Sequence, residues 1–323
     1  MLRLLLLFLC FSLELSAQSE WTDGPSFYIR SINFTGNRRT KERIMLRELN
    51  IAPGDQIQKD EIDELLHFNK RRLLNMQLFS QVDFTMCHDA NDTIDLQFNV
   101  SEIFFWIPKP VFSLADRNFN VWWYEQNNRL DRTNIGLELT RLNFRGRNER
   151  IGGTVQVGYN KFFDVFYKIP YVDKNLKHGI GLSATYQTGR EINFKTDSNK
   201  IKFFRRDEYP YRNFQTEFTY TYRPAYAWIH EVNLNYNYLS ITEELFNKNP
   251  DFFHGKKKLN FFELKYTLRF NNTDVRVYPI HGLETKFQVS KKGLGFDKDV
   301  NQFILYNETS FYKRLINNLS MAL

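Results

Sequence analysis

The sequence predicts a small N-terminal α+β domain followed by an antiparallel transmembrane β-barrel. The first observation is the compact segment 27–102, whose hydrophobic patterns follow the order βααββ. The second is a two-residue alternation of apolar and polar residues, which runs through later segments of about nine residues or more. The third is composition, because aromatic residues reach 16% although the mean hydropathy is −0.50. Soluble cores rely mainly on aliphatic residues, whereas aromatic side chains suit surfaces between water and an apolar phase.

The N-terminus has the pattern of a secretory signal peptide. A positive charge precedes the apolar run Leu4–Phe11, and small residues lead up to Ala17. The run is too short to span a bilayer, and Glu14 follows it, which disfavours the alternative of an uncleaved anchor. We therefore predict a signal peptide over residues 1–17 and a linker over residues 18–26.

The segment 27–102 contains the patterns of three strands and two helices. An alternating strand at Tyr28–Phe34 is expected to place its even-numbered residues on one face, and a turn follows it. Thr40 stands where the N-cap of a first helix is expected, and a second helix is predicted from Lys59 to Asn75. Two further alternating strands are predicted around Val82–Met86 and Ile94–Phe98.

Three stretches of this segment resemble a POTRA domain, the periplasmic module of the BamA/TamA outer-membrane assembly superfamily. They are INFTGNRRTKERIMLREL, GDQIQKDEIDELLHFNKRRLLNMQLFSQVDF and DTIDLQFNVSE. The resemblance covers nearly the whole of residues 27–102. Each fragment alone is a common strand or helix pattern, so a small α+β domain with an unrelated role is the alternative.

In residues 103–323 one pattern recurs in segment after segment, in which every second residue is apolar. In EVNLNYNY, residues 231–238, Glu and Asn occupy one parity while Val, Leu and Tyr occupy the other. A soluble sandwich would also alternate, but its strands more often stop at about five or six residues. Because every backbone amide in a bilayer needs a partner, such strands are stable there only in a closed barrel. We therefore predict that the apolar parity faces lipid and the polar parity faces water.

Three of these segments, LNFRGRNERIGGTVQVGY, FDVFYKIPYVD and VYPIHGLETKFQVSKKG, resemble successive barrel hairpins of the same superfamily, which includes the bacterial surface antigens. A fourth, PVFSLADRNFNVWW, resembles the first barrel strand and loop of its single-POTRA members. Alternation predicts about ten strands, with a further one starting at Asn318, and long extracellular loops at 195–206 and 243–258. Family barrels have sixteen strands, so we expect an incomplete barrel and a sequence that is a fragment of a longer protein.

The resemblance implies a lateral gate, because family barrels open between their first and last strands. Pro108 and Pro110 lie two apart in the expected first barrel strand, Phe104–Leu114, so both missing N–H groups face the same neighbour. The alternative is that two prolines merely end a short strand before a loop. The predicted gate residues are Phe104, Phe105, Trp106, Pro108, Pro110 and Phe112.

A second predicted contact for clients is the edge strand of the POTRA domain. An exposed strand edge can pair with an added strand through its backbone, whatever the side chains are. The predicted residues of this edge are Phe79, Val82, Phe84 and Met86.

The residues offer little support for catalysis, a cofactor or a metal site. The six His residues are far apart, and no metal-binding or nucleophile motif is present in the sequence. The net charge of +7 comes without a long basic run, so nucleic acid is not an expected partner.

The resemblance implies a bacterial outer-membrane protein whose POTRA domain lies in the periplasm. The expected function is assembly, in which the POTRA domain delivers unfolded outer-membrane proteins and the barrel inserts or folds them through a lateral gate. Outer-membrane lipid and accessory lipoproteins are the other expected partners. One alternative is a two-partner-type secretion pore for a dedicated exported protein. The other is a lipid-modifying enzyme, which would need a catalytic cluster that the sequence does not place.

Overall fold

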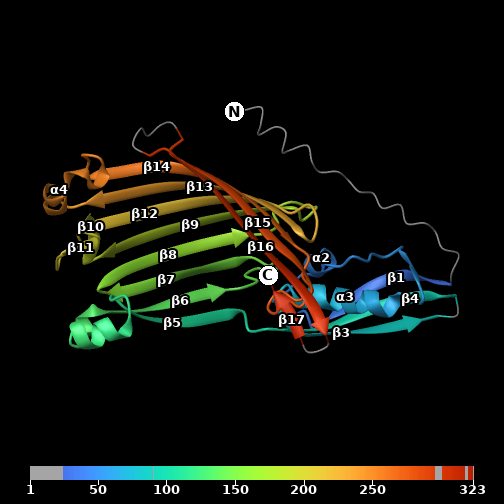
Figure 1. Ribbon diagram of the computed structural model, residues 1–323. Helices are drawn as coiled ribbons and strands as arrows, with labels where there is room; N and C mark the ends of the chain where they lie inside the picture. Colours follow the sequence, from blue (N-terminus) through green and yellow to red (C-terminus); the bar gives the residue numbers. More distant parts are fainter. Residues whose placement is uncertain (1–24, 90, 295–299, 317–318, 323) are drawn as a thin grey trace.

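The computed structural model describes residues 25–89, 91–294, 300–316 and 319–322. The predicted signal peptide and the linker residues 18–24 lie outside the described residues. A small mixed sheet with two helices is followed by a large antiparallel sheet (Figure 1). The link between them is short, because the small domain ends at Glu102 and the first strand of the large sheet begins at Trp106.

The α+β domain has the predicted elements and one short additional strand. The strand order in its sheet is β2-β1-β4-β3, with β1 and β4 parallel and the other pairs antiparallel. The additional strand is β2, which follows the predicted chain break and pairs with the start of β1. Its elements are β1 (Ser26–Thr35), α2 (Glu42–Leu46), β2 (Gln56–Gln58), α3 (Ile62–Leu74), β3 (Phe79–His88) and β4 (Thr93–Glu102).

The core of this domain forms where one face of α3 covers the sheet. Ile62, Leu66 and Leu73 of α3 are buried, as the helical spacing predicts. Ile94 and Phe98 of β4 are fully buried opposite them. Complete burial of each such side chain stabilises the fold by about 1.5–3 kcal/mol, so the domain has a substantial core of its own.

The predicted alternation of β1 is wrong near Arg30. The register of β1 against β4 shifts between Ile29 and Ser31. A bulge of this kind moves the following residues to the opposite face. As a result Ile29 and Phe34 both reach the core, although their parities differ.

The predicted N-cap at Thr40 is also wrong. The N-cap of α2 is Lys41, and no side chain caps the helix. Thr40 is buried, and its hydroxyl instead donates to Glu102 and accepts a hydrogen bond from Asn143. The side chain of Thr40 therefore makes tertiary hydrogen bonds instead of capping α2, as the local sequence had predicted.

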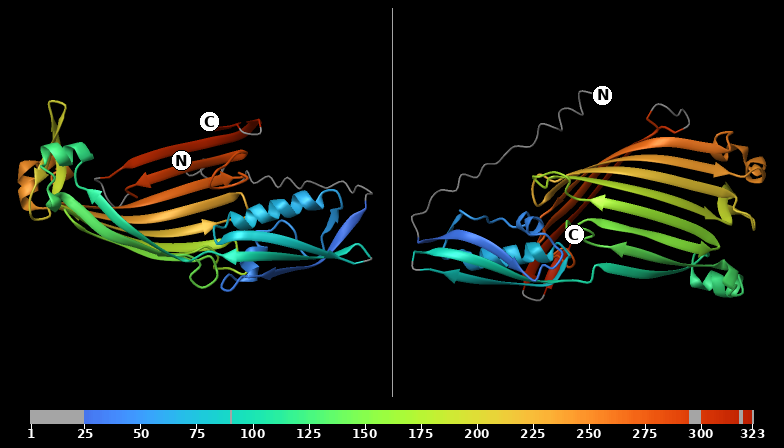
Figure 2. Two further views of the ribbon diagram at one scale, coloured as in Figure 1. Left: turned by 90° about the horizontal axis from the view of Figure 1, so that it is seen from below. Right: turned by 180° about the vertical axis from the view of Figure 1, so that it is seen from behind.

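The large sheet has eleven strands in the described residues, in the order β17-β16-β15-β14-β13-β12-β9-β8-β7-β6-β5. Each strand pairs antiparallel with its neighbours, and the sheet curves into a trough (Figure 2). Its strands are β5 (Trp106–Leu114), β6 (Thr133–Arg141), β7 (Arg150–Gly158), β8 (Asn160–Ile169), β9 (His178–Gly189), β12 (Tyr211–Tyr222), β13 (Trp228–Ile241), β14 (Lys258–Asn271), β15 (Gly282–Lys292), β16 (Gln302–Ile316) and β17 (Leu319–Ala322).

The connections far from the α+β domain carry the remaining elements. The segment 195–206 was predicted to be a loop, but most of it belongs to a hairpin of β10 (Glu191–Asp197) and β11 (Lys200–Arg205). The predicted loop 243–258 contains α4 (Glu243–Lys248) and the turn η3 (Pro250–Phe253). A small apolar cluster that includes Phe204 and Leu245 packs these elements together, which explains why the hairpin is ordered. The connection after β5 contains η1 (Val121–Glu125) and η2 (Leu130–Arg132).

Burial in the large sheet is the reverse of that in a soluble protein. On β13 the polar Asn233 is 1% exposed, whereas the neighbouring Leu234 is 40% exposed. Asn233 donates to Thr219 of the adjacent strand on the concave face, while Leu137 and Leu182 are exposed on the outer face. The alternation predicted for EVNLNYNY is therefore confirmed, with polar residues inside and an apolar band outside.

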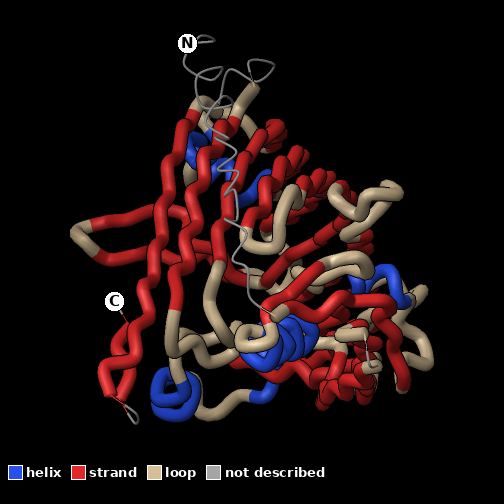
Figure 3. The backbone as a smooth tube through the Cα atoms, turned by 90° about the vertical axis from the view of Figure 1, so that its right-hand side faces the viewer, coloured by secondary structure: helices blue, strands red, loops and turns tan. Residues whose placement is uncertain are grey.

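Figure 3 shows the curved sheet and the α+β domain from the domain's side. None of the helices in the described part of the chain is long and apolar enough to cross a membrane.

Candidate functional site

β5 is the terminal strand of the described sheet, and its backbone has an open edge. At one end of the pair with β6, Leu142 N donates to Phe105 O at 2.8 Å, and at the other Ala115 N donates to Arg132 O at 2.8 Å. The register between these bonds is unbroken, and bonded pairs alternate in an antiparallel ladder. The odd-numbered residues of β5 therefore bond to β6, and the even-numbered residues face the open edge.

Pro108 and Pro110 are both even-numbered, so both face the open edge of β5. Proline has no N–H, and the edge consequently lacks two of the hydrogen-bond donors that a strand of this length would offer. A strand that pairs with this edge would leave two of its carbonyl groups without a backbone donor.

The structure divides the predicted gate residues between the strand and the domain junction. Phe104 and Phe105 precede β5, and Phe105 is buried in the core cluster of the α+β domain. Trp106 begins β5 beneath the guanidinium of Arg141, and Phe112 is 68% exposed on the outer face. The strand that borders the open edge is thus Trp106–Leu114, two residues shorter than predicted.

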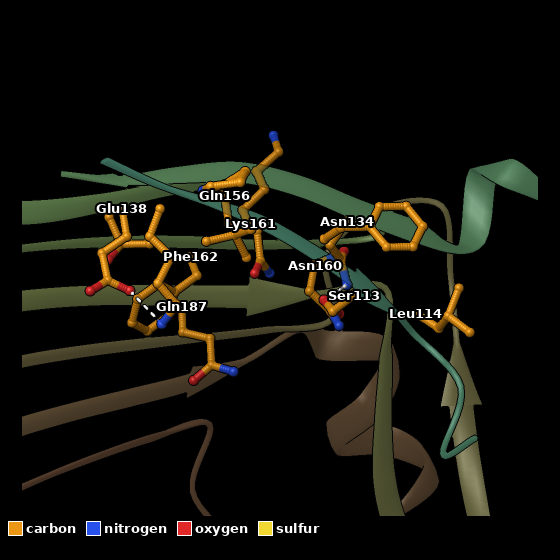
Figure 4. Close-up of a pocket in the computed structure, with 14 residues that line it drawn as sticks. Ser113, Leu114, Asn134, Glu138, Gln156, Asn160, Lys161, Phe162 and Gln187 are labelled. Carbon is orange, nitrogen blue, oxygen red and sulfur yellow. Dashed lines mark hydrogen bonds and ion pairs between the residues drawn. The ribbon is translucent and has the colours of Figure 1, made fainter. Parts of the chain in front are cut away.

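A hollow of about 570 Å³ lies against β5 and is lined by residues of β5 to β9 (Figure 4). Polar side chains of the inner parity, among them Asn134, Gln156 and Gln187, line it. Lys109 of β5 forms an ion pair with Glu138 of β6 at 3.2 Å within it. The hollow beside the edge strand therefore has a mixed lining, because Val111 and Phe162 also border it.

The predicted edge of the α+β domain is β3, the outer strand of its sheet. Asp89 N donates to Thr93 O, so the odd-numbered residues of β3 bond to β4. The backbone groups of Val82, Phe84 and Met86 accordingly face the free edge. The side chain of Val82 is buried in the core, as is that of the fourth predicted residue, Phe79, so an added strand would meet backbone more than side chains.

The α+β domain contacts four successive turns of the sheet, which the sequence did not single out. These proximal turns are residues 142–149, 170–177, 223–227 and 272–281. Asn75, next to the end of α3, donates to Asp274 O at 3.1 Å and accepts a hydrogen bond from Arg276 N. Lys41 N donates to Gly146 O at 2.9 Å. The two parts of the chain are therefore joined by many contacts as well as by the link.

Glu48 is the centre of the junction. Arg223 donates to both of its carboxylate oxygens, at 2.7 and 2.9 Å, and Tyr171 donates to it at 3.0 Å. Arg47 donates to Glu48 at 3.1 Å and to the carbonyl of Leu176 at 2.6 Å. Glu48 is only 3% exposed, so this bidentate pair is shielded from water.

The charge state of Glu48 follows from these contacts. Burial by itself raises the pKa of a carboxyl group, but the charge and hydrogen bonds of Arg223 outweigh it, and the pKa of Glu48 is lowered. Burial also opposes the charged form of Arg223, yet the adjacent carboxylate raises its pKa. Because the folded-state pKa of Glu48 is below its usual value, its contribution is full at neutral pH and is lost only as the pH falls through that lowered pKa.

Gly146 lets the first proximal turn approach the α+β domain. Its φ is +74°, and a Cβ atom there would lie 2.0 Å from the carbonyl oxygen of Arg39. Only glycine fits a left-handed position this close to another backbone.

We expect Gly146→Ala to loosen the junction at this turn. The clash with Arg39 adds to the strain of the left-handed conformation, which itself costs about 1–2 kcal/mol. The rate of hydrogen–deuterium exchange in residues 39–46 and 142–149 should rise about tenfold for each 1.4 kcal/mol of local stability that the variant loses. Gly255→Ala is the matched control, because Gly255 has φ +79° with no atom within 4 Å of the added Cβ. Equal exchange in the two variants would contradict the role of the contact.

No group of three or more His, Cys, Asp or Glu residues that could hold a metal ion occurs among the described residues. Cys87 is free and exposed.

Two family profiles match the chain. A POTRA profile, described as a surface antigen variable number repeat, matches residues 27–103. The profile of the Omp85 superfamily domain matches residues 143–323. Comparison with curated protein sequences gives no match.

The chain is also similar to solved structures of outer-membrane proteins. BamA from Haemophilus ducreyi lacking POTRA domains 1–3 matches with a TM-score of 0.51 and 15% identity, over 90% of this chain and 52% of that chain. CdiB from Escherichia coli matches with a TM-score of 0.49 and 8% identity, over 92% of this chain and 53% of that chain. The present chain therefore spans about half the length of these structures, and the likeness to BamA shows the fold.

The apolar outer band, the polar concave face and the attached α+β domain define a protein that crosses a membrane with strands. The chain belongs to the Omp85 superfamily and has a single POTRA domain in its described part. Membership implies an outer-membrane location with the POTRA domain in the periplasm, which places the proximal turns on the periplasmic side. Proteins of this superfamily are assembly or secretion channels.

Proposed function

We propose that this chain is part of an outer-membrane assembly factor that inserts or folds β-barrel proteins at the edge of β5. The observation that carries the proposal is the pair of prolines facing that edge. A terminal strand offers its backbone to any strand that can pair with it. Two missing donors weaken whatever pairing closes the barrel at rest, so the edge can open to a client strand at low cost.

The POTRA domain fits a delivery role in the same scheme. Val82, Phe84 and Met86 leave backbone groups of β3 unpaired by another strand in the described sheet. An extended client can add to this edge by backbone hydrogen bonds without a sequence requirement, which suits a factor with many clients.

Depletion of the intact protein in its own cells tests the proposed function. We expect the levels of many outer-membrane barrel proteins to fall together, as measured by quantitative proteomics of isolated outer membranes. Restoring the full-length gene should restore them, which controls for secondary damage. Loss of one exported protein with unchanged barrel proteins would contradict the proposal and favour a dedicated secretion pore. Altered lipids alone would contradict it in favour of a lipid-modifying enzyme.

A further inference from the structure

A second hollow lies where the POTRA domain meets the foot of β5. Its volume is about 270 Å³, and it is distinct from the hollow on the concave face. Residues from the β1–α2 connection, the link between domains and the end of β6 contribute to it. Its lining residues are Arg38, Arg39, Glu102, Ile103, Phe104, Phe105, Trp106 and Arg141.

This basic hollow has an excess of positive charge. Arg38, Arg39 and Arg141 contribute three guanidinium groups, and Glu102 is the single carboxylate in the lining. Glu102 is already engaged, because it accepts hydrogen bonds from Arg39 N at 3.1 Å and Thr40 N at 2.7 Å. Among the described residues, none of the three guanidinium groups forms an ion pair. The hollow therefore favours a ligand with negative charge.

Two residues that line the basic hollow belong to the outer face of the barrel wall. Trp106 pairs with Arg141 in the β5–β6 ladder, and both share the parity of the exposed residues Leu137 and Leu139. The Arg141 guanidinium lies 4.9 Å from the centre of the Trp106 ring. Trp at the end of a membrane strand, with Arg extending from the apolar surface, is typical of the depth of lipid headgroups.

An apolar surface adjoins the charged groups. Phe104 is 76% exposed and Trp106 is 42% exposed beside the hollow. A ligand that has a negative headgroup and hydrocarbon chains would satisfy both parts of this surface. A free anion would leave the aromatic side chains in water.

We propose that the basic hollow binds the phosphate of an anionic phospholipid from the periplasmic leaflet. The arginines hold the phosphate, and the acyl chains lie along Phe104 and Trp106 beside the outer face of β5. The inference rests on the outer-membrane location of the barrel but not on which clients it handles. Bound lipid would hold the β1–α2 connection of the POTRA domain close to the bilayer at the foot of the edge strand.

The test uses the full-length protein, purified in detergent, with phosphatidylglycerol as the probe and native mass spectrometry as the readout. Arg38→Gln/Arg39→Gln and Arg141→Gln are expected to weaken lipid binding about fivefold for each arginine removed. Arg43→Gln on the exposed surface of α2 removes one charge outside the hollow, as Arg141→Gln does inside it, and is expected to bind lipid like the natural protein. Arg38→Lys/Arg39→Lys keeps the charge and should retain most binding, which separates a lost charge from a lost fold.

Three results would overturn this inference. They are equal binding by all variants, an equal loss in Arg43→Gln, and displacement of the lipid by inorganic phosphate at the same concentration. The last result would mean that the site recognises an anion without the lipid chains. Because no client is present in this measurement, its failure is distinguishable from failure of the proposed assembly function.

Discussion

Arg223→Met is expected to release the POTRA domain from the proximal turns. The substitution keeps much of the side-chain volume but leaves the carboxylate of Glu48, which is 3% exposed, without its bidentate partner. Removing one member of a buried ion pair costs about 3–5 kcal/mol, because the remaining charge stays buried. Hydrogen–deuterium exchange of the intact protein should therefore rise strongly in residues 42–49 and 170–177, while the centres of the sheet strands stay protected.

Two variants make this prediction specific. Glu48→Gln/Arg223→Met also removes the carboxylate and should recover part of the protection, since the only group among the described residues that then loses its ionic partner is Arg47, which keeps its hydrogen bond to Leu176 O. Lys70→Met breaks the more exposed pair with Asp83 and should change exchange little, because surface ion pairs contribute about 0–1 kcal/mol. If Arg223→Met exchanged no faster at the junction than Lys70→Met, the buried pair would not be what holds the domain.

Pro108→Val/Pro110→Val is expected to slow client insertion. The double substitution returns two N–H donors to the open edge of β5, and each hydrogen bond contributes about 0.5–1.5 kcal/mol. A total of about 1–3 kcal/mol favours the strand pairing that closes the barrel and lowers the population of the open edge by about 5–150-fold. The measurement is the rate at which the full-length protein, reconstituted in liposomes, inserts an unfolded outer-membrane protein.

The control for this experiment lies on the same strand. Val111→Ile changes a side chain of β5 whose backbone groups face β6, so it leaves the donors of the open edge unchanged. We expect it to insert clients at the natural rate. Unchanged insertion by the double proline variant would contradict the proposed role of the open edge.

The architecture could be predicted because the signal is local. Neighbouring residues such as Asn233 and Leu234 lie on opposite faces of one strand, so the sequence itself records which face meets water. The buried face of α3 is likewise recorded by the spacing of apolar residues within one short segment. Short or irregular features carry no such signal. β2 has three residues, and the bulge at Arg30 interrupts an alternation that otherwise predicts the wrong face for Ile29.

The junction could not be predicted from the sequence, because its partners are distant along the chain. Glu48 and Arg223 are separated by 175 positions, and neither stands in a recognisable motif. Thr40 even matched a local rule, yet its hydroxyl pairs with Glu102 and Asn143. The spacing of Pro108 and Pro110 is enough to predict that both face the same neighbouring strand. Only the register of β5 with β6 shows that they face the open edge.

The four contacts of the POTRA domain with the proximal turns have a consequence for how the barrel can deform. These turns join β6 to β7, β8 to β9, β12 to β13 and β14 to β15, so they sample most of the arc of the sheet. If that arc flattened, the distances between the turns would grow, and Thr40, Glu48 and Asn75 could not all keep their partners. The POTRA core thus fixes the distances between these turns. We expect bending to be confined to the strands that the proximal turns do not join, β5 at one side of the sheet and those beyond β15 at the other.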